Sequence, residues 1–279
     1  MNETIHEHYI EAGKIAGKVR NEAERRIKEN IPLLDVANFV EDRILEMGGD
    51  IAFPCNISIN EIASHYTPED DAALFRKGDV VKIDIGVHIN GFIADTACTV
   101  EIGTLNHTLL IRATREALAN AISSIKDNAQ TRSIGKIIEG TIKKYGFSPL
   151  KDLTGHSLEQ FKLHAGVSIP NYGTLFSNKI KKDMVFAIEP FATYGKGDIK
   201  HGKPHIFAVN PNTKEKTALE LKDRFGVLPF AKRWIPATGA ANLKGLREYA
   251  ELIETTGEIV AQSEHTVIVN ESGCEIITS

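Results

Sequence analysis

Two carboxylates interrupt an apolar stretch of this sequence, at positions where a buried strand would normally carry aliphatic side chains. The stretch KIDIGVHINGFIADTACTV, residues 82–100, places apolar, partly β-branched runs on both sides of Asn90-Gly91, and Asn-Gly in that setting is a strong signal for a two-residue hairpin turn. With that turn, Asp84 and Asp95 project from one face of the hairpin, on a diagonal that separates their Cβ atoms by roughly 7–8 Å at most.

Carboxylates this close repel each other, so either one of them stays protonated or a cation lies between them. Removing an ionised carboxylate from water without a partner costs a large amount of free energy, and the chain must therefore supply compensating charge. A divalent metal ion is the simplest source, because hard and borderline ions prefer oxygen ligands. On the hairpin alone, an aspartate that pairs with an arginine or caps a turn is the commoner arrangement.

Three further residues could complete a metal site. Glu189 in VFAIEPF and Glu264 in VAQSEHTVIV are also acids within apolar runs, and His156 lies in TGHSLEQFKLHAG. Together with Asp84 and Asp95 they form a set rich in carboxylates that can bridge, which suits two metals roughly 3.5 Å apart better than one. No thiolate accompanies them, which disfavours a structural zinc site and leaves Mn, Fe, Co or catalytic Zn open. The alternative is that these acids form internal salt bridges in a protein with no site.

Composition excludes several classes of function. The chain has 279 residues, 42% of them hydrophobic and 25% charged, and its net charge of -4 gives no global basic field for nucleic acid or anionic lipid. No run approaches the length of a membrane span, and the polar, acidic start is unlike a signal peptide, so we expect a cytoplasmic protein without membrane or specific nucleic-acid binding. The three cysteines, Cys55, Cys98 and Cys274, are too few and too scattered for a disulfide framework.

The elements that must position these residues follow from hydrophobic periodicity. The pattern predicts two helices and then strands, twice over, which indicates a duplicated α+β unit. The predicted helices cover residues 3–29, 33–47, 104–127 and 131–145, and the predicted strands lie around residues 79–101, from Met184 and from Glu258. Residues 211–250 differ, because Thr213 to Phe225 and Asn242 to Glu251 have helical patterns, and this segment is predicted to be a helical insertion between two strands.

From about Tyr9 to Thr278 the sequence resembles the type II methionine aminopeptidases, in the short form without a long N-terminal extension. The motifs that carry the resemblance are an Asp pair eleven positions apart, a Gly-His, an apolar strand ending in Glu, a final Glu-His-Thr and the segment FPCNISINEIASHYTP. The resemblance implies an α+β fold of the pita-bread (creatinase/aminopeptidase) type with pseudo-twofold symmetric halves. It also implies a single catalytic domain, residues 1–279, that contains a helical insertion subdomain at residues 206–257.

The activity that the resemblance implies is removal of the N-terminal methionine from peptides and nascent proteins by hydrolysis assisted by two divalent ions (Co, Mn, Fe or Zn). Asp84 would bind one metal in a bidentate manner, Asp95 and Glu264 would bridge, and His156 with Glu189 would complete the shell of the other metal. The implied partners are nascent chains, with the ribosome as a place of contact, and the implied state is a monomer.

The resemblance also assigns roles around the metals. Glu189 is the expected proton acceptor, His65 is expected to contact the scissile amide, and His164 is expected to steady the oxyanion. The implied substrate-binding residues, which include an apolar slot for the unbranched thioether, are Phe53, His65, Leu163, His164, His205 and Tyr249.

Two alternatives to this activity stay open at the level of sequence. One is a proline-directed aminopeptidase or dipeptidase of the same fold, although such relatives usually carry an additional N-terminal domain. The other is a catalytically inactive relative that binds ribosomes, RNA or proteins, although such proteins lose ligands and all five candidates are present here.

Overall fold

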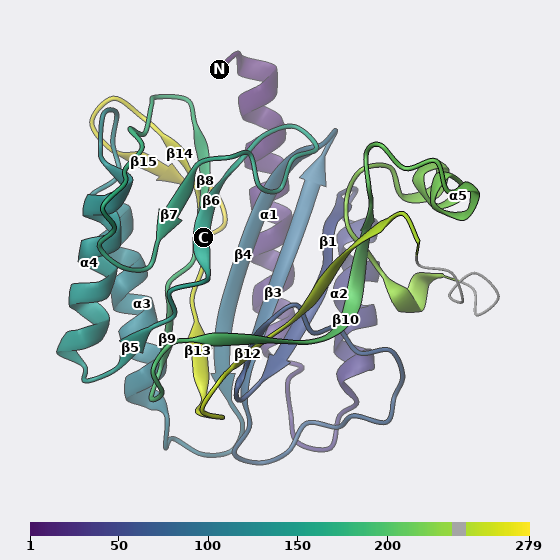
Figure 1. Ribbon diagram of the computed structural model, residues 1–279, viewed down its shortest axis with the longest axis horizontal. Coiled ribbons are helices and arrows are strands. Elements are labelled where there is room, and N and C mark those ends of the chain that lie inside the picture. Colours follow the sequence, from purple (N-terminus) through teal and green to yellow (C-terminus); the bar gives the residue numbers. More distant parts are fainter. Residues whose placement is uncertain (236–243) are drawn as a thin grey trace.

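The computed structural model describes residues 1–235 and 244–279. Helices and short sheets alternate along the chain, with strands at the centre and helices outside (Figure 1). None of the helices in the described ranges is both long and apolar enough to cross a membrane. The elements in chain order are α1 (Glu3–Glu24), α2 (Leu33–Glu46), β1 (Asp50–Ile59), β2 (Ile62–Ser64), β3 (Val80–Ile89), β4 (Phe92–Glu101), α3 (Thr108–Ser123), α4 (Thr131–Lys144), β5 (Ser148–Pro149), β6 (Thr154–Leu158), β7 (Ser168–Pro170), β8 (Val185–Ile188), β9 (Phe191–Thr193), β10 (Ile199–Val209), α5 (Lys216–Phe225), β11 (Phe230–Ala231), the 3₁₀ turn η1 (Lys232–Trp234), β12 (Leu246–Glu254), β13 (Val260–Gln262), β14 (His265–Val269) and β15 (Cys274–Ile276).

The first half is a three-stranded sheet, in the order β1-β3-β4, with α1 packed against β3 and β4 and α2 packed against β1. Ile15 and Val19 of α1 and Val40 of α2 are fully buried in this layer, as their helical spacing predicts. In Figure 1, α1 lies behind β3 and β4. The two predicted helices are confirmed, although the first ends at Glu24 and not at residue 29.

The β3–β4 hairpin has the predicted turn and register. Asn90 and Gly91 both have positive φ, 51° and 85°, as a type I′ turn requires. Gly86 pairs with Asp95, and Asp84 pairs with Ala97, two residues further along β4. The two aspartates therefore share one face of the hairpin, and the prediction from Asn-Gly is confirmed.

Strand β1 contains an irregularity that matters for the site. Its pairing with β3 shifts register between Phe53 and Asn56, which face Gly86 and Asp84 respectively. Such β-bulges insert residues into one strand and change the direction in which its side chains point. A Cβ at Gly86 would approach Phe53 N to 3.1 Å, so glycine lets the bulged strand lie close.

The second half repeats the arrangement with α3 and α4 packed over two sheets, a five-stranded one in the order β15-β14-β8-β6-β7 and a three-stranded one in the order β13-β9-β5. Leu110, Ile138, Phe186 and Val267 join in its buried apolar core. Glu189 follows the last residue of β8, and Glu264 lies in the break between β13 and β14. The double pattern of helix pair and sheet confirms the predicted α+β class.

The insertion is only partly helical. Helix α5 and the turn η1 lie in it, but Leu246 to Glu254 form strand β12, which pairs with β10 along most of its length. The predicted helix from Asn242 to Glu251 is therefore wrong from residue 246 onward, and Asn242 lies outside the described residues. REYAELIE contains good helix formers, but pairing with β10 on one side and β2 on the other overrides that local preference.

Candidate metal centre and substrate pocket

The five predicted ligands line one pocket of about 240 Å³. They come from both halves of the fold: two from the β3–β4 hairpin, one from β6, one from the end of β8 and one from the break before β14. Figure 1 shows these elements side by side at the centre of the molecule. The complete lining is Phe53, Asn56, Ser64, His65, Asp84, Asp95, Asp152, Leu153, Thr154, His156, Leu163, His164, Glu189, Leu252 and Glu264.

The side chains of the five residues converge. Asp95, His156 and Glu264 each offer one ligand atom, and the three atoms lie within 4.8 Å of one another. Glu189 Oε1 lies 3.4 Å from His156 Nε2. Asp84 Oδ2 accepts a hydrogen bond of 3.1 Å from the Gln262 amide, whose nitrogen also lies 3.5 Å from a Glu189 oxygen.

Threonine hydroxyls join the two halves beside these ligands, where β4 and β14 belong to different sheets. The Thr266 hydroxyl accepts from the backbone N–H of Asp95 and donates to its carbonyl, both at 2.7 Å. On the other side, Thr96 Oγ1 donates to the carbonyl of Glu264 at 2.9 Å. We call these hydrogen bonds of Thr96 and Thr266, together with the residues that they join, the seam. It fixes the backbone at both carboxylates that are expected to bridge.

Burial dominates the electrostatics of the four acids. It raises the pKa of Asp84 to about 6 and raises the pKa values of Asp95, Glu189 and Glu264 well above the ordinary range, with mutual repulsion adding to the last three. Within residues 1–235 and 244–279, no lysine or arginine forms an ion pair with any of them. That arrangement does not fit the alternative of internal salt bridges, because none of the four acids has a lysine or arginine partner there, and the histidine beside Glu189 is neutral.

The donor set is suited to divalent cations. Asp95 Oδ1, Glu264 Oε2 and His156 Nδ1 are buried atoms without a hydrogen-bond partner, which is a costly state unless another group satisfies them. Burial lowers the pKa of His156 to about 3, so its imidazole is neutral, the form that binds metals. Carboxylate and imidazole ligands without thiolates are typical of catalytic metal sites.

His65 and His164 flank this cluster. Burial lowers the pKa of each to about 4, so both rings are neutral at physiological pH. His65 adopts a positive φ of 66°, and its Nδ1 lies 3.2 Å from the carbonyl of Ala250, which fixes that nitrogen as the donor. The ring of His164 lies 4.3 Å from that of His156, centroid to centroid. Each histidine therefore offers a neutral ring to the pocket.

An aromatic wall lies beside His65. The Phe53 ring is 5.7 Å from the His65 ring and 5.4 Å from the Tyr249 ring, and the latter two are 5.6 Å apart. Leu163, on the loop before His164, is nearly buried and lines the same pocket. Phe53 and Leu163 thus line the pocket of the candidate metal ligands, and Tyr249 packs behind them against Phe53 and His65 without lining that pocket.

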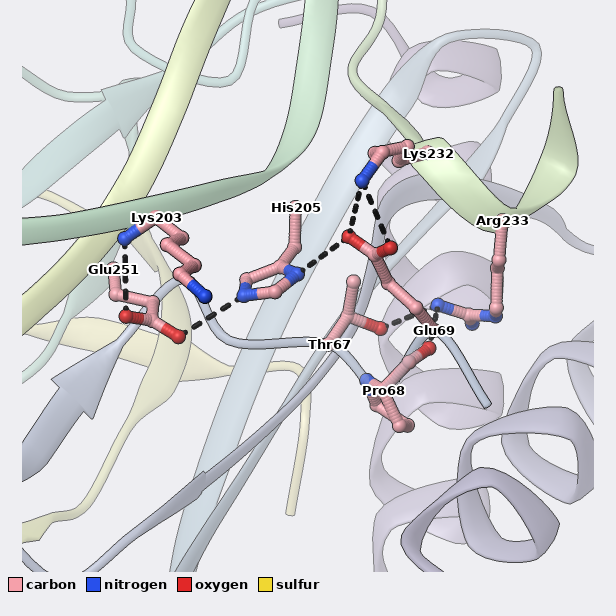
Figure 2. A network of polar contacts seen from close by, with 8 residues as sticks. All are labelled: Thr67, Pro68, Glu69, Lys203, His205, Lys232, Arg233 and Glu251. Atoms are coloured by element: carbon pink, nitrogen blue, oxygen red, sulfur yellow. Dashed lines mark hydrogen bonds and ion pairs between the residues drawn. The ribbon is translucent and has the colours of Figure 1, made fainter. Parts of the chain in front are cut away.

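His205 lies elsewhere. Its ring is held between two acids, with Nδ1 2.8 Å from Glu69 and Nε2 3.0 Å from Glu251, and it borders a separate surface hollow with Lys203 and Lys232 (Figure 2). It is not among the residues that line the pocket of the candidate metal ligands. The expected substrate contact of His205 therefore has no support in this arrangement, because the two carboxylates occupy both ring nitrogens.

Some pocket residues were not anticipated from the sequence. Asn56, Ser64, Asp152 and Thr154 line the pocket, and Gln262 holds two of its acids. Gln262 gave a usable signal, since a polar residue two positions before Glu264 in an apolar run is as unusual as the glutamate itself. Asn56 gave none, because only the bulge in β1 turns it toward the pocket.

Comparisons with known proteins give a consistent result. The sequence profile described as Metallopeptidase family M24 matches residues 7–271. The chain is 44% identical to a methionine aminopeptidase of Thermococcus onnurineus, over 96% of this chain and 98% of that protein, and 41% identical to one of Methanothermobacter thermautotrophicus, over 98% of each. Among solved structures, the methionine aminopeptidase of Thermotoga maritima has a TM-score of 0.78 at 24% identity and covers 100% of this chain and 98% of its own.

Proposed function

The chain belongs to metallopeptidase family M24, and from that premise we propose that it removes the N-terminal methionine from peptides and nascent proteins by hydrolysing the first peptide bond. The family and the pita-bread fold expected from the sequence motifs are confirmed. The observation that carries the proposal is the meeting of four buried carboxylates and a neutral imidazole in a pocket beside aromatic rings, with no lysine or arginine partner among the residues that the structure describes.

The family is a metallopeptidase family, so the chain binds divalent metal. We propose two ions, because four acids exceed what one divalent charge needs, and Asp84, Asp95, His156, Glu189 and Glu264 would hold them. Divalent ions in such a site lower the pKa of water toward neutrality and polarise the scissile carbonyl.

Glu189 is the proposed proton carrier. A carboxylate can accept and return a proton, and Glu189 would take one from the attacking water as the carbon–oxygen bond forms. The same proton would then pass to the nitrogen of the departing peptide as the carbon–nitrogen bond breaks. Glu189 returns to its starting form at the end of each turnover.

The two neutral histidines would hold the substrate amide. We assign His164 to the developing oxyanion, which needs a hydrogen-bond donor, and His65 to the scissile amide. The methionine side chain would lie against Phe53, Leu163 and Tyr249. A missing methylene in such an apolar slot is worth only about 1–3 kcal/mol, so steric closure must provide much of the selectivity.

The test is hydrolysis of Met-Ala-Ser, Ala-Ala-Ser and Ala-Pro peptides with Mn, Fe, Co or Zn in turn. We expect cleavage of Met-Ala-Ser alone, and loss of that cleavage when its α-amine is acetylated. Cleavage of Ala-Pro in place of Met-Ala-Ser would point to the proline-directed alternative. Absence of bound metal and of any hydrolysis after metal is restored would overturn the proposal.

We further propose that the enzyme acts as a single-domain monomer on nascent chains in the cytoplasm, with the insertion at residues 206–257 as part of that domain. A single unfolding transition, a monomer mass by light scattering and co-sedimentation with translating ribosomes are the expected results. Separate transitions or a larger mass would contradict it.

A further inference from the structure

A buried amide faces the candidate site without a partner. Asn56 is 3% exposed and lines the pocket of the metal ligands, and its Oδ1 has no hydrogen-bond partner. A buried acceptor in this state lowers stability, and native proteins satisfy the great majority of such atoms. A ligand that brings a donor would satisfy it.

The backbone is shaped to place this amide there. In a regular strand, residues three positions apart point to opposite faces, so Phe53 and Asn56 could not both face one pocket. The register shift between them removes that restriction, and both line the pocket. Bulges of this kind occur next to active sites, where they redirect a side chain. The bulge therefore gives the pocket an apolar residue and an amide side by side.

The chemistry of the substrate selects the group that Asn56 would bind. The unpartnered atom of Asn56 is an acceptor, and the thioether sulfur and the first carbonyl oxygen of a methionyl peptide only accept hydrogen bonds, so they cannot satisfy it. The donors of the substrate are the scissile N–H, which we assign to His65, and the α-amine. Asn56 is the cross-strand partner of Asp84, on the side of the cluster that β1 and β3 form. An amide is also neutral, so it accepts from an amine without adding a fifth negative charge to Asp84, Asp95, Glu189 and Glu264.

We propose that Asn56 recognises the free α-amine of the substrate. This inference rests on the proposed function. It adds a residue that binds the free α-amine, the group that a peptide N-terminus has and an internal segment of a chain lacks. Asn56 acts by direct contact with the substrate, so its loss weakens substrate binding and leaves the metal ligands in place.

The test compares two substitutions on the same strand. Asn56→Leu keeps the volume and removes the amide, and we expect a KM for Met-Ala-Ser that is about tenfold or more higher, unchanged metal content and a higher Tm of the metal-free protein. Ser58→Ala is the matched control, because the Ser58 hydroxyl is also buried without a partner on β1 but does not line the pocket. It should leave KM unchanged. A lower Tm and an unchanged KM for Asn56→Leu would overturn the proposal.

A second measurement identifies which group of the substrate Asn56 binds. Competitive binding is compared for methioninamide, norleucinamide and 4-(methylthio)butanamide, which lacks the amine. We expect Asn56→Leu to weaken the first two equally and to leave the third unchanged. A larger loss for methioninamide than for norleucinamide would assign Asn56 to the sulfur and overturn the amine assignment. These binding values do not depend on turnover, so an inactive wild type that still binds methioninamide through Asn56 would overturn the proposed function alone.

Discussion

At the scale of single residues, burial decides which groups can do chemistry. Glu189 is 9% exposed, and its surroundings are other acids and a neutral histidine, so burial and repulsion raise its pKa and favour the protonated form in the metal-free protein. His65 and His164 are neutral for the same reason, since burial opposes the charged form of an imidazole. Burial therefore favours the uncharged form of all three side chains in the metal-free protein.

Replacing Glu189 by Gln should reduce kcat about 100- to 10,000-fold, because the amide cannot accept and return the proton. Metal content should fall only in part, since the other four ligands remain. Turnover of Met-Ala-Ser and metal analysis of the purified variant measure both quantities. Glu159→Gln, an exposed acid paired with Lys162, is the control and should keep wild-type turnover. Full activity in Glu189→Gln would exclude the assignment.

The raised pKa of Glu264 predicts how pH affects the metal-free protein. An acid whose pKa is higher in the folded than in the unfolded chain adds most stability below its ordinary pKa, about 4, and that contribution is lost as pH rises toward the raised value. The lowered pKa values of His65, His156 and His164 act in the opposite direction between about pH 3 and 6.5, so a single pH curve mixes the two effects.

A difference curve isolates the acid. In chelator, the Tm of Glu264→Gln minus that of the wild type should increase from pH 5 to pH 8, because only the wild type must ionise a buried carboxylate. Saturating Mn should reverse the sign at pH 8. A difference that does not change with pH would show that Glu264 is not buried in the manner described.

Sequence reasoning found the five candidate ligands because an acid inside an apolar run breaks a strong physical rule. It did not find Asn56, since a neutral amide breaks that rule only weakly and its direction depends on a bulge. His205 was assigned by resemblance, and no local pattern in the sequence indicated that Glu69 and Glu251 would hold its ring.

At the scale of elements, a buried ion pair anchors the insertion to the first half. Arg233 of η1 pairs with Glu41 of α2, and Trp234 Nε1 donates to the same carboxylate at 3.0 Å. Arg233 also donates to the Thr67 hydroxyl at 2.5 Å and reaches the Pro68 carbonyl, two and three residues after His65 (Figure 2). The insertion thus contacts the loop that carries a proposed substrate-binding histidine.

Arg233→Met should destabilise the protein by about 3–5 kcal/mol, because it leaves the Glu41 carboxylate buried and unpaired. The double variant Glu41→Gln/Arg233→Met should recover much of that loss, since the glutamine is neutral and can still accept from Trp234. Urea unfolding of the wild type and of the two variants measures these differences. Equal stability of the single and double variants would mean that the unpaired charge is not the cause.

Element prediction succeeded where local and tertiary preferences agree. The Asn-Gly turn fixed the register of β3 and β4, and the apolar stripes of α1 and α2 match their buried faces. It failed at β12, where residues with helical preference are held extended by strands on both sides. The bulge in β1 likewise depends on a neighbouring strand and has no signature in the sequence of β1 alone.

At the scale of the whole molecule, the ligands come from two halves that meet at the seam. Without a bound cation, four buried acids repel one another across this line, and threonine hydroxyls supply local attraction. A bound ion attracts ligands from both halves at once.

Divalent metal should therefore stabilise the protein strongly. At a free concentration of 100 times the dissociation constant, the gain is about 2.7 kcal/mol for one site. Calorimetry with and without Mn, together with limited proteolysis in chelator, measures the effect. Thr266→Val, which removes a seam hydroxyl, should make the metal-free form more sensitive to protease while added Mn restores much of the protection. A Tm that does not respond to metal would contradict the proposed centre.

Because the candidate ligands lie on both sides of the seam, neither half contains a complete ligand set. Residues 1–103 carry two of the five candidate ligands and residues 104–279 carry three, and exposed Leu105 marks the connection between these segments. If the chain were cut at that connection and the fragments were mixed, capture of a cation would become a reporter of complementation, because an intact ligand set exists only when both fragments reassemble.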